Sequence, residues 1–334
     1  MHASTPSPRP PIRRRRRLLL LAVGLLLPCA LIEITLRVVD PAHTAETIER
    51  EHFTEAILER GSGGALALRK GAAGTLLGHR AEIGAQGFRT PPFDPHKAQD
   101  TYRILVIGDS VAFGWGVAEQ DSFPRVIERE LQKGVIPGGK ARVEVIDAAV
   151  PGWGVPHYLQ LLEQQGLSWQ PDLVLVTLIN NDLTDILDVL DPTPRSQPFL
   201  LPSFLRWSYL ARIVERTIAV ASSRDLRSDF FVAIDVDPAR RAKATTALCE
   251  AFARMQSDLG KIPLCVMDTI IGSKGERLDD FVACAKQRGF TRIDASLARP
   301  DYKTVYAVSP TDDHPNAAGH RELARIALDW IRSR

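Results

Sequence analysis

From residue 101 onward, apolar and polar positions follow two distinct periods. Short, nearly continuous apolar runs predict buried strands, and longer segments with one apolar face predict amphipathic helices. The strand predictions are 102–110, 141–150, 172–182, 261–268 and 290–296. The helix predictions are 121–134, 156–167, 204–222, 238–259, 276–289 and 316–334. Because strands and helices alternate, the pattern predicts a doubly wound, flavodoxin-like α/β fold, in which helices cover both faces of a parallel sheet as a three-layer αβα sandwich.

A separate apolar segment precedes this pattern near the N-terminus. Residues 18–32 carry no charge, and the arginines of 13–17 stand immediately before them. Extension to Val39 gives the roughly 20 residues that a membrane span needs, although the segment then includes Glu33 and Arg37. We expect 1–17 to be a basic, disordered cytoplasmic tail and 18–39 to be an uncleaved transmembrane signal-anchor. A cleaved signal peptide is the alternative, because its apolar core has a similar length.

A membrane anchor of this orientation predicts that the rest of the chain lies outside the cytoplasm, in the periplasm or at the cell surface. Residues 40–100 have a mixed composition and are expected to form a juxtamembrane connector, with one helix near 45–60, to an α/β domain of 101–334. The stretch 190–237 fits the α/β pattern least. We interpret it as a lid or insertion, or as a surface helix that faces the core or the membrane.

Net charge and cysteine content exclude some classes of protein. The formal net charge of +2 gives no basis for nucleic-acid binding. The four cysteines include no C-x-x-C pair, so neither a zinc site nor a redox motif is indicated, and we expect no metal and no cofactor. Export would permit a disulfide among Cys249, Cys265 and Cys284, but buried free thiols are the preferred interpretation.

Polar or small residues follow each of the first three predicted strands, and a further polar group precedes the last helix. These four groups are 108–110, 149–154, 180–182 and 311–316. In a doubly wound sheet, functional groups collect at the carboxyl ends of the strands. We therefore expect all four groups to meet at one edge of the sheet.

The four groups together contain what acyl transfer requires. Ser110 can attack a carbonyl, and His314 is the only general base among them. Oxyanion donors are the backbone N–H groups of Ser110 and Gly152 and the side-chain amide of Asn181. A carboxylate beside His314 would hold the correct tautomer. The competing interpretation is that Ser110 only caps the helical turn that follows it.

The same residues resemble the SGNH (GDSL) hydrolase family. GDS at 108–110, a glycine after the second strand, an Asn-Asp pair after the third and a late HPN at 314–316 stand in the family's order. The stretches IGAQGFRT, YRILVIGDSVAFGWGV and HPNAAGH are similar to the membrane-anchored bacterial branch. The resemblance spans about 84–334. It implies Ser110 as nucleophile, Gly152 and Asn181 as oxyanion donors, His314 as base and Asp109 as a structural residue.

Two positions depart from the family's pattern. The third block usually begins with glycine, but Ile179 stands there. The fourth block is usually Asp-x-x-His, but Thr311 stands three residues before His314 and cannot act as the carboxylate. We therefore expect Asp312 to orient the base, because one intervening residue lets its side chain turn back toward the ring, with Asp313 as the alternative.

The sequence thus predicts a membrane-anchored serine esterase that acts through a Ser-His-Asp acyl-enzyme on an ester, such as an O-acetylated glycan or a lipid. Two alternatives stay open. The enzyme could be an O-acetyltransferase that passes the acyl group to a cell-surface polysaccharide, or the chain could be a non-catalytic carbohydrate-binding or scaffold protein that retains the fold. The expected partners are the small-molecule or glycan ester and the membrane, and the sequence names no protein partner.

Overall fold

The structure is a computed structural model. It describes residues 11–40, 43–61, 65–179, 181–190, 202, 205–221, 238–272 and 279–334. The chain divides into two compact units. One comprises Met1–Ile48 with Ser196–Leu226, and the other comprises Glu49–Arg195 with Arg227–Arg334.

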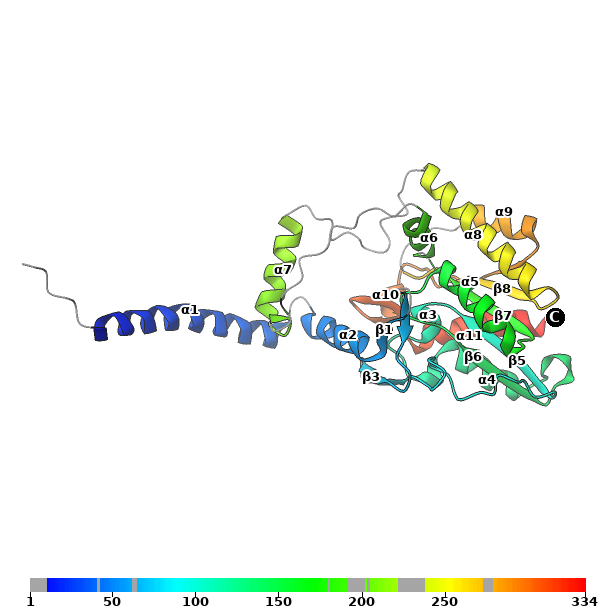
Figure 1. Cartoon of the computed structure of the whole chain (residues 1–334), viewed down its shortest axis with the longest axis horizontal. Helices are drawn as coiled ribbons and strands as arrows, with labels where there is room; N and C mark the ends of the chain where they lie inside the picture. The colour runs from blue at the N-terminus through cyan, green and yellow to red at the C-terminus, as the bar shows by residue number, and fades with distance from the viewer. Residues whose placement is uncertain are drawn as a thin grey trace, which may run out of the picture. The chain divides into compact units, whose positions relative to one another are not determined.

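The larger unit is built on a parallel sheet of five strands, which confirms the predicted fold class (Figure 1). The strands are β5 (Thr101–Ile107), β6 (Arg142–Asp147), β7 (Leu173–Leu178), β8 (Leu264–Asp268) and β9 (Thr291–Asp294). Their order in the sheet is β6-β5-β7-β8-β9. This is the flavodoxin-like order, in which the second strand is added on one side of the first strand and all later strands are added on the other side. Strands β7 and β8 are buried along their whole length, as near-continuous apolar runs require.

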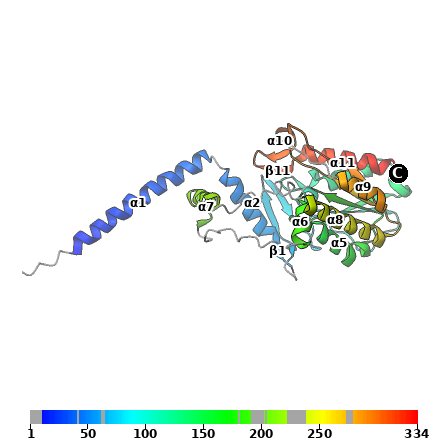
Figure 2. The ribbon, with the colours of Figure 1, turned by 90° about the horizontal axis from the view of Figure 1, so that it is seen from above.

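Helices cover both faces of this sheet. They are α4 (Phe123–Gln132), α5 (Val155–Gln164), α8 (Pro238–Leu259), α9 (Asp279–Arg288) and α11 (Ala317–Arg332). Helix α4 packs against α11, whereas α8 packs against both α5 and α9. Figure 2 shows α11 and α5 on opposite sides of the strands. Right-handed crossovers account for this arrangement. The chain first adds β6 on one side of β5 and then adds β7, β8 and β9 on the other side, and this change of direction moves the connecting helices to the other face.

Shorter elements surround the sandwich, and the apolar periodicity predicted few of them. Three antiparallel hairpins pair β1 (Leu58–Arg60) with β2 (Leu66–Leu68), β3 (Ala73–Leu76) with β4 (His79–Glu82), and β10 (Ala307–Ser309) with β11 (Asp312–Pro315). Helix α2 (Thr44–Ile57) corresponds to the helix expected near 45–60. The short helices are α3 (Ser110–Phe113), α6 (Asp182–Leu190) and α10 (Tyr302–Val305), with single 3-10 turns at Glu119–Asp121, Pro137–Gly139 and Gly166–Trp169.

The compact unit that holds the sheet begins at Glu49, within α2, rather than at residue 101. Phe53, Ile57, Leu68 and Leu76 are buried in the same hydrophobic core as the strands. Most of the segment that we expected to be a connector therefore packs as part of the α/β unit. The proposed lid of 190–237 lies largely outside the described residues and stays a prediction.

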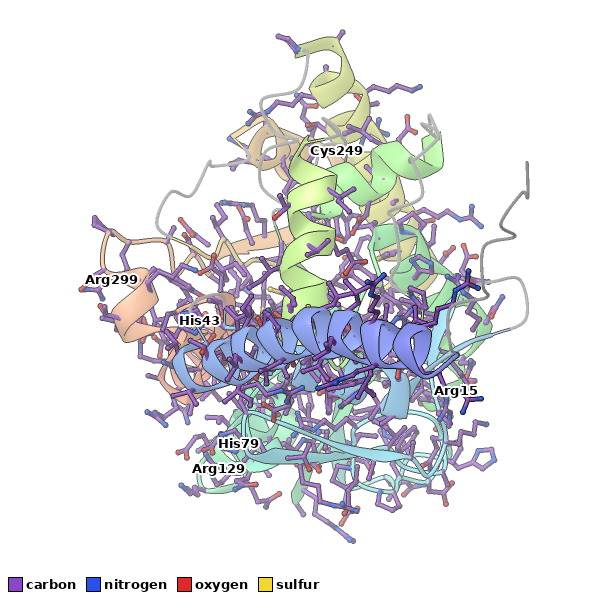
Figure 3. The ribbon with its side chains drawn as sticks, turned by 90° about the vertical axis from the view of Figure 1, so that its left-hand side faces the viewer. Arg15, His43, His79, Arg129, Cys249 and Arg299 are labelled. Carbon is purple, nitrogen blue, oxygen red and sulfur yellow. A yellow bond between two sulfur atoms is a disulfide. The ribbon has the colours of Figure 1, made fainter. Side chains whose placement is uncertain are left out.

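The smaller unit contains α1 (Pro11–Val39) and α7 (Tyr209–Ala221), which contact each other. Residues Arg14–Val39 have a mean hydropathy of 2.4 in their most apolar window, long and apolar enough to cross a membrane. Arg15 lies at the N-terminal end of this helix (Figure 3). The Glu33 carboxylate accepts hydrogen bonds from the backbone N–H groups of Tyr209 and Leu210. A carboxylate inside an apolar helix is thereby paired with the N-terminal turn of α7.

Two of the four cysteines are joined. Cys249 on α8, labelled in Figure 3, forms a disulfide with Cys284 on α9, whereas Cys29 and Cys265 are free. The expectation of free thiols is therefore wrong for Cys249 and Cys284. The sequence could not reveal this pairing, because it depends on how two helices separated by a strand come together on one face of the sheet.

Candidate active site

Ser110 is the first residue of α3, three residues beyond the end of β5, which lies between β6 and β7 in the sheet. Asp109 is the N-cap of this helix, and its carboxylate accepts a hydrogen bond of 2.9 Å from the backbone N–H of Val111. The interpretation of Ser110 as the cap is therefore wrong, because the preceding aspartate occupies that position. The Ser110 hydroxyl is therefore not used as a helix cap and lies within hydrogen-bond distance of His314.

Gly108 is required by the close approach of the neighbouring strand. A Cβ atom on Gly108 would lie 2.1 Å from Thr177 Oγ1 and 2.7 Å from Ala112 Cβ. Neither neighbour is the end of a long flexible side chain, so neither can move aside easily. The glycine of the GDS triplet thus lets Thr177 of β7 and Ala112 of α3 lie close to the backbone that leads from β5 to Ser110.

We expect Gly108→Ala to destabilise the fold by about 1–3 kcal/mol, because the added methyl group overpacks this site. Thermal unfolding followed by circular dichroism measures the effect. Thr177→Ala in the same chain should restore part of the loss by removing the nearest atom. Gly134→Ala is the matched control, since its Cβ would have only the Glu130 carbonyl oxygen nearby, at 3.9 Å. Equal melting temperatures for Gly108→Ala and the control would contradict the packing explanation.

His314 reaches Ser110 from a hairpin strand that is 204 residues further along the chain. Its Nε2 lies 2.8 Å from Ser110 Oγ, and its Nδ1 lies 2.5 Å from Asp312 Oδ1. The backbone N–H of His314 donates to the same Asp312 oxygen at 3.0 Å. The serine hydroxyl, imidazole and carboxylate therefore form one continuous series of hydrogen bonds.

Asp312 and Asp313 face different surroundings, because successive side chains of strand β11 point to opposite faces. Asp312 and His314 are two residues apart and share a face. Asp313 forms an ion pair with Lys303, and its backbone carbonyl accepts a hydrogen bond of 2.6 Å from the Tyr302 hydroxyl. Of these two carboxylates, only Asp312 is hydrogen-bonded to the His314 imidazole.

The second oxygen of Asp312 is also bound by two donors. Trp115 Nε1 donates to Oδ2 at 3.1 Å, and Arg50 Nη1 donates to the same oxygen at 3.3 Å. Although burial raises the pKa of Asp312, the hydrogen bonds from His314 and the nearby Arg50 charge outweigh it and hold this pKa well below its usual range. The carboxylate is therefore ionised at neutral pH while being only 4% exposed.

The sequence did not identify Arg50 or Trp115 as contacts of the catalytic carboxylate. Trp115 stands five residues after Ser110, so its proximity to the site could have been anticipated. Arg50 gave no such signal, because it lies on a separate helix whose position depends on tertiary packing alone.

Gly152 and Asn181 follow β6 and β7, the two strands that flank β5. Gly152 has a φ of 82°, a conformation that favours glycine. The amide nitrogen of Asn181 donates to Asp185 Oδ2 at 3.0 Å. The loop after β6 contacts the start of α6, since a Cβ on Gly154 would lie 3.0 Å from Asp185 Cβ. The strand order thus brings both residues to the edge that carries Ser110.

Ile179, which stands where the family has glycine, is accommodated without strain. Its φ is not positive, and its backbone N–H donates to Asp182 Oδ2 at 2.8 Å. Burial, together with the charge of nearby Asp109, raises the pKa of Asp182 well above its usual value. Burial likewise raises the pKa of Asp109 to about 6. These two buried carboxyl groups accept hydrogen bonds from the backbone N–H groups of Val111 and Ile179, and thereby hold the backbone beside the site.

Within the described ranges, no group of three or more His, Cys, Asp or Glu side chains could hold a metal ion.

Comparison with known proteins identifies the family of this chain. The sequence model of the GDSL-like Lipase/Acylhydrolase family matches residues 106–322. No curated protein is significantly similar in sequence. A variant of Axe2, an acetyl-xylooligosaccharide esterase from Geobacillus stearothermophilus, is 16% identical with a TM-score of 0.43, over 69% of this chain and 94% of its own. A two-domain esterase active on acetylated mannans is 13% identical with a TM-score of 0.42, over 70% of this chain and 50% of its own. Similarities this low identify no substrate.

Proposed function

Because the chain belongs to the GDSL-like lipase/acylhydrolase family and is an ester hydrolase of that type, we propose that it cleaves its ester through an acyl-enzyme formed on Ser110. The observation that carries this proposal is the hydrogen-bond series from Ser110 Oγ to His314 Nε2 and from His314 Nδ1 to Asp312 Oδ1. A hydroxyl bonded to a base that is itself oriented by a carboxylate is the arrangement that activates a serine nucleophile.

In the first half-reaction, Ser110 Oγ attacks the ester carbonyl carbon while His314 Nε2 takes the hydroxyl proton. The C–O bond to the alcohol then breaks, and His314 returns the proton to the departing alcohol oxygen. In the second half-reaction, a water molecule attacks the acyl-enzyme with His314 again as base. The resulting tetrahedral intermediate then collapses and releases the carboxylic acid, while His314 returns the proton to Ser110 Oγ and so restores the hydroxyl. Asp312 stabilises the imidazolium that forms in each half.

The proposed oxyanion donors are the backbone N–H groups of Ser110 and Gly152 and the side-chain amide of Asn181. Preorganised donors aimed at the developing charge commonly provide the largest single contribution to such catalysis. Two observations support their assignment. The positive φ of Gly152 gives its loop a turn that other residues adopt poorly, and Asp185 holds the Asn181 amide by a hydrogen bond.

A serine-reactive fluorophosphonate tests the proposed nucleophile without knowledge of the substrate. The full chain in detergent should be labelled, and the modified peptide should contain Ser110, because only an activated hydroxyl displaces fluoride from phosphorus readily. Heat-unfolded chain is the control and should remain unlabelled. Modification at another serine, or no modification of the folded chain, would contradict the proposal.

We propose that α1 anchors the enzyme in a membrane, with the α/β unit on the extracytoplasmic side. The arginine cluster at the start of α1 supports this orientation. The Cys249–Cys284 disulfide supports export, since disulfides persist mainly in oxidising compartments. In that location the esters within reach are those of envelope glycans and lipids. Addition of a polysaccharide acceptor to the hydrolysis assay distinguishes transfer from hydrolysis, because transfer yields acylated sugar.

A further inference from the structure

The carboxylate of Asp312 receives a cation from outside the segment that matches the family. Arg50 lies on α2, more than 50 residues before the start of the match at residue 106. Its guanidinium donates to Asp312 Oδ2, the oxygen that does not contact His314. We propose that Arg50 is a positioning residue for the catalytic carboxylate, so that α2 is a working part of the active site. This inference rests on the proposed function of the Ser110-His314-Asp312 series.

Helix α2 is held where Arg50 can make this contact. Arg50, Phe53 and Ile57 are spaced three and four residues apart and therefore share one face of the helix. The Phe53 ring meets the Trp115 ring edge-on with centroids 5.2 Å apart, and Ile57 is fully buried. Next to Arg50, the Glu49 carboxylate accepts a hydrogen bond of 2.7 Å from the backbone N–H of Leu77. The position of α2 is thus fixed by Glu49 on one side of Arg50 and by Phe53 and Ile57 on the other.

Trp115 links this helix to the catalytic series. One side of its indole packs on Phe53, and its ring lies 5.5 Å from the His314 ring with an angle of 33° between planes. Its Nε1 and Arg50 Nη1 converge on the same Asp312 oxygen. Two donors from different elements therefore hold the carboxylate in the plane that presents its other oxygen to His314. A carboxylate held in this way needs little reorientation when the imidazolium forms.

Arg50 is also the positive charge on this face of the carboxylate. The side chains that bond to the Asp312 carboxylate in the part of the chain that the structure describes are the His314 imidazole, the neutral Trp115 indole and the Arg50 guanidinium. Lys303 pairs with Asp313 instead. Because the Arg50 side chain is 29% exposed, solvent screens part of its charge. We therefore expect its removal to slow the reaction by less than the loss of a catalytic residue would.

Kinetics of the full chain in detergent with 4-nitrophenyl acetate test this inference. Arg50→Met and Arg50→Gln keep most of the side-chain length but remove the charge, and each should lower kcat about 10-fold with KM changed by less than about twofold. Arg50→Lys keeps a cation and should recover most of kcat. Arg80→Met is the matched control, because Arg80 belongs to the same N-terminal segment but pairs with Glu82 at the surface. Its kcat should equal that of the wild type.

Melting temperatures from circular dichroism show which variants are folded, and two charge-removing variants guard against the failure of one. A kcat within about twofold of wild type in the folded charge-removing variants would overturn the inference, as would equal losses in Arg50→Lys and Arg50→Met. Ser110→Ala, measured beside them, separates the two proposals. If Ser110→Ala is as active as the wild type, the proposed function fails. If Ser110→Ala is inactive and Arg50→Met is fully active, only the role of Arg50 fails.

Discussion

Ser110→Ala is expected to lower kcat for ester hydrolysis by about a millionfold, to the residual rate that substrate binding and the oxyanion donors alone supply. The alanine cannot form the acyl-enzyme, and no other hydroxyl occupies the position 2.8 Å from His314 Nε2. The side chain removed is small and caps no helix, because Asp109 performs that role. Hydrolysis of 4-nitrophenyl acetate by the purified full chain measures the loss directly.

Ser168→Ala is a suitable control for this experiment, since the Ser168 hydroxyl is exposed and donates only to the Gln165 carbonyl oxygen. Its activity should equal that of the wild type. Melting temperatures of both variants should also match the wild type closely. Folded Ser110→Ala that kept more than about one hundredth of the wild-type kcat would remove Ser110 from the role of nucleophile.

Asp312→Asn is expected to lower kcat by about 10⁴-fold, whereas Asp313→Asn should stay within about threefold of the wild type. An asparagine at 312 can present its amide to His314 Nδ1, which favours the wrong tautomer and leaves the imidazolium without a counter-charge. Asp313 instead pairs with Lys303, which is 44% exposed, so its neutralisation affects a partly solvated ion pair. Parallel hydrolysis assays of the two variants compare adjacent residues of the same type.

Equal and mild losses in both variants would show that neither carboxylate orients His314. A larger loss in Asp313→Asn would assign that role to Asp313. Because Asp312 is buried and bound by Arg50 and Trp115, its variant also needs a melting curve, and only the folded fraction should enter the comparison.

The order of elements could be predicted from the sequence because it depends on local patterns. Apolar runs such as 102–107 and 173–178 are long enough to be buried on both faces, and the intervening segments have one apolar face. The parallel sheet and its covering helices follow from this alternation. The small hairpins could not be predicted in the same way, because strands of three or four residues are too short to establish a period.

The sequence by itself also predicted which residues would lie at one edge of the sheet. Ser110, Gly152 and Asn181 each follow a strand, and carboxyl ends of parallel strands meet at one edge regardless of their separation along the chain. The placement of His314 before the last helix and the order of the four groups are enough to indicate acyl chemistry. That inference needs only the order of strands and helices along the chain, which the local pattern of apolar residues predicts.

Only the tertiary structure decided the contacts around His314. Asp312 rather than Asp313 faces the imidazole because 312–315 form a strand, and a strand alternates its side chains between two faces. Arg50 and Trp115 reach Asp312 because α2 packs its apolar face on the loop after Ser110. The pairing of Cys249 with Cys284 likewise follows from the packing of α8 on α9. Local pattern places residues along elements, but the faces that meet are selected by packing between elements far apart in the chain.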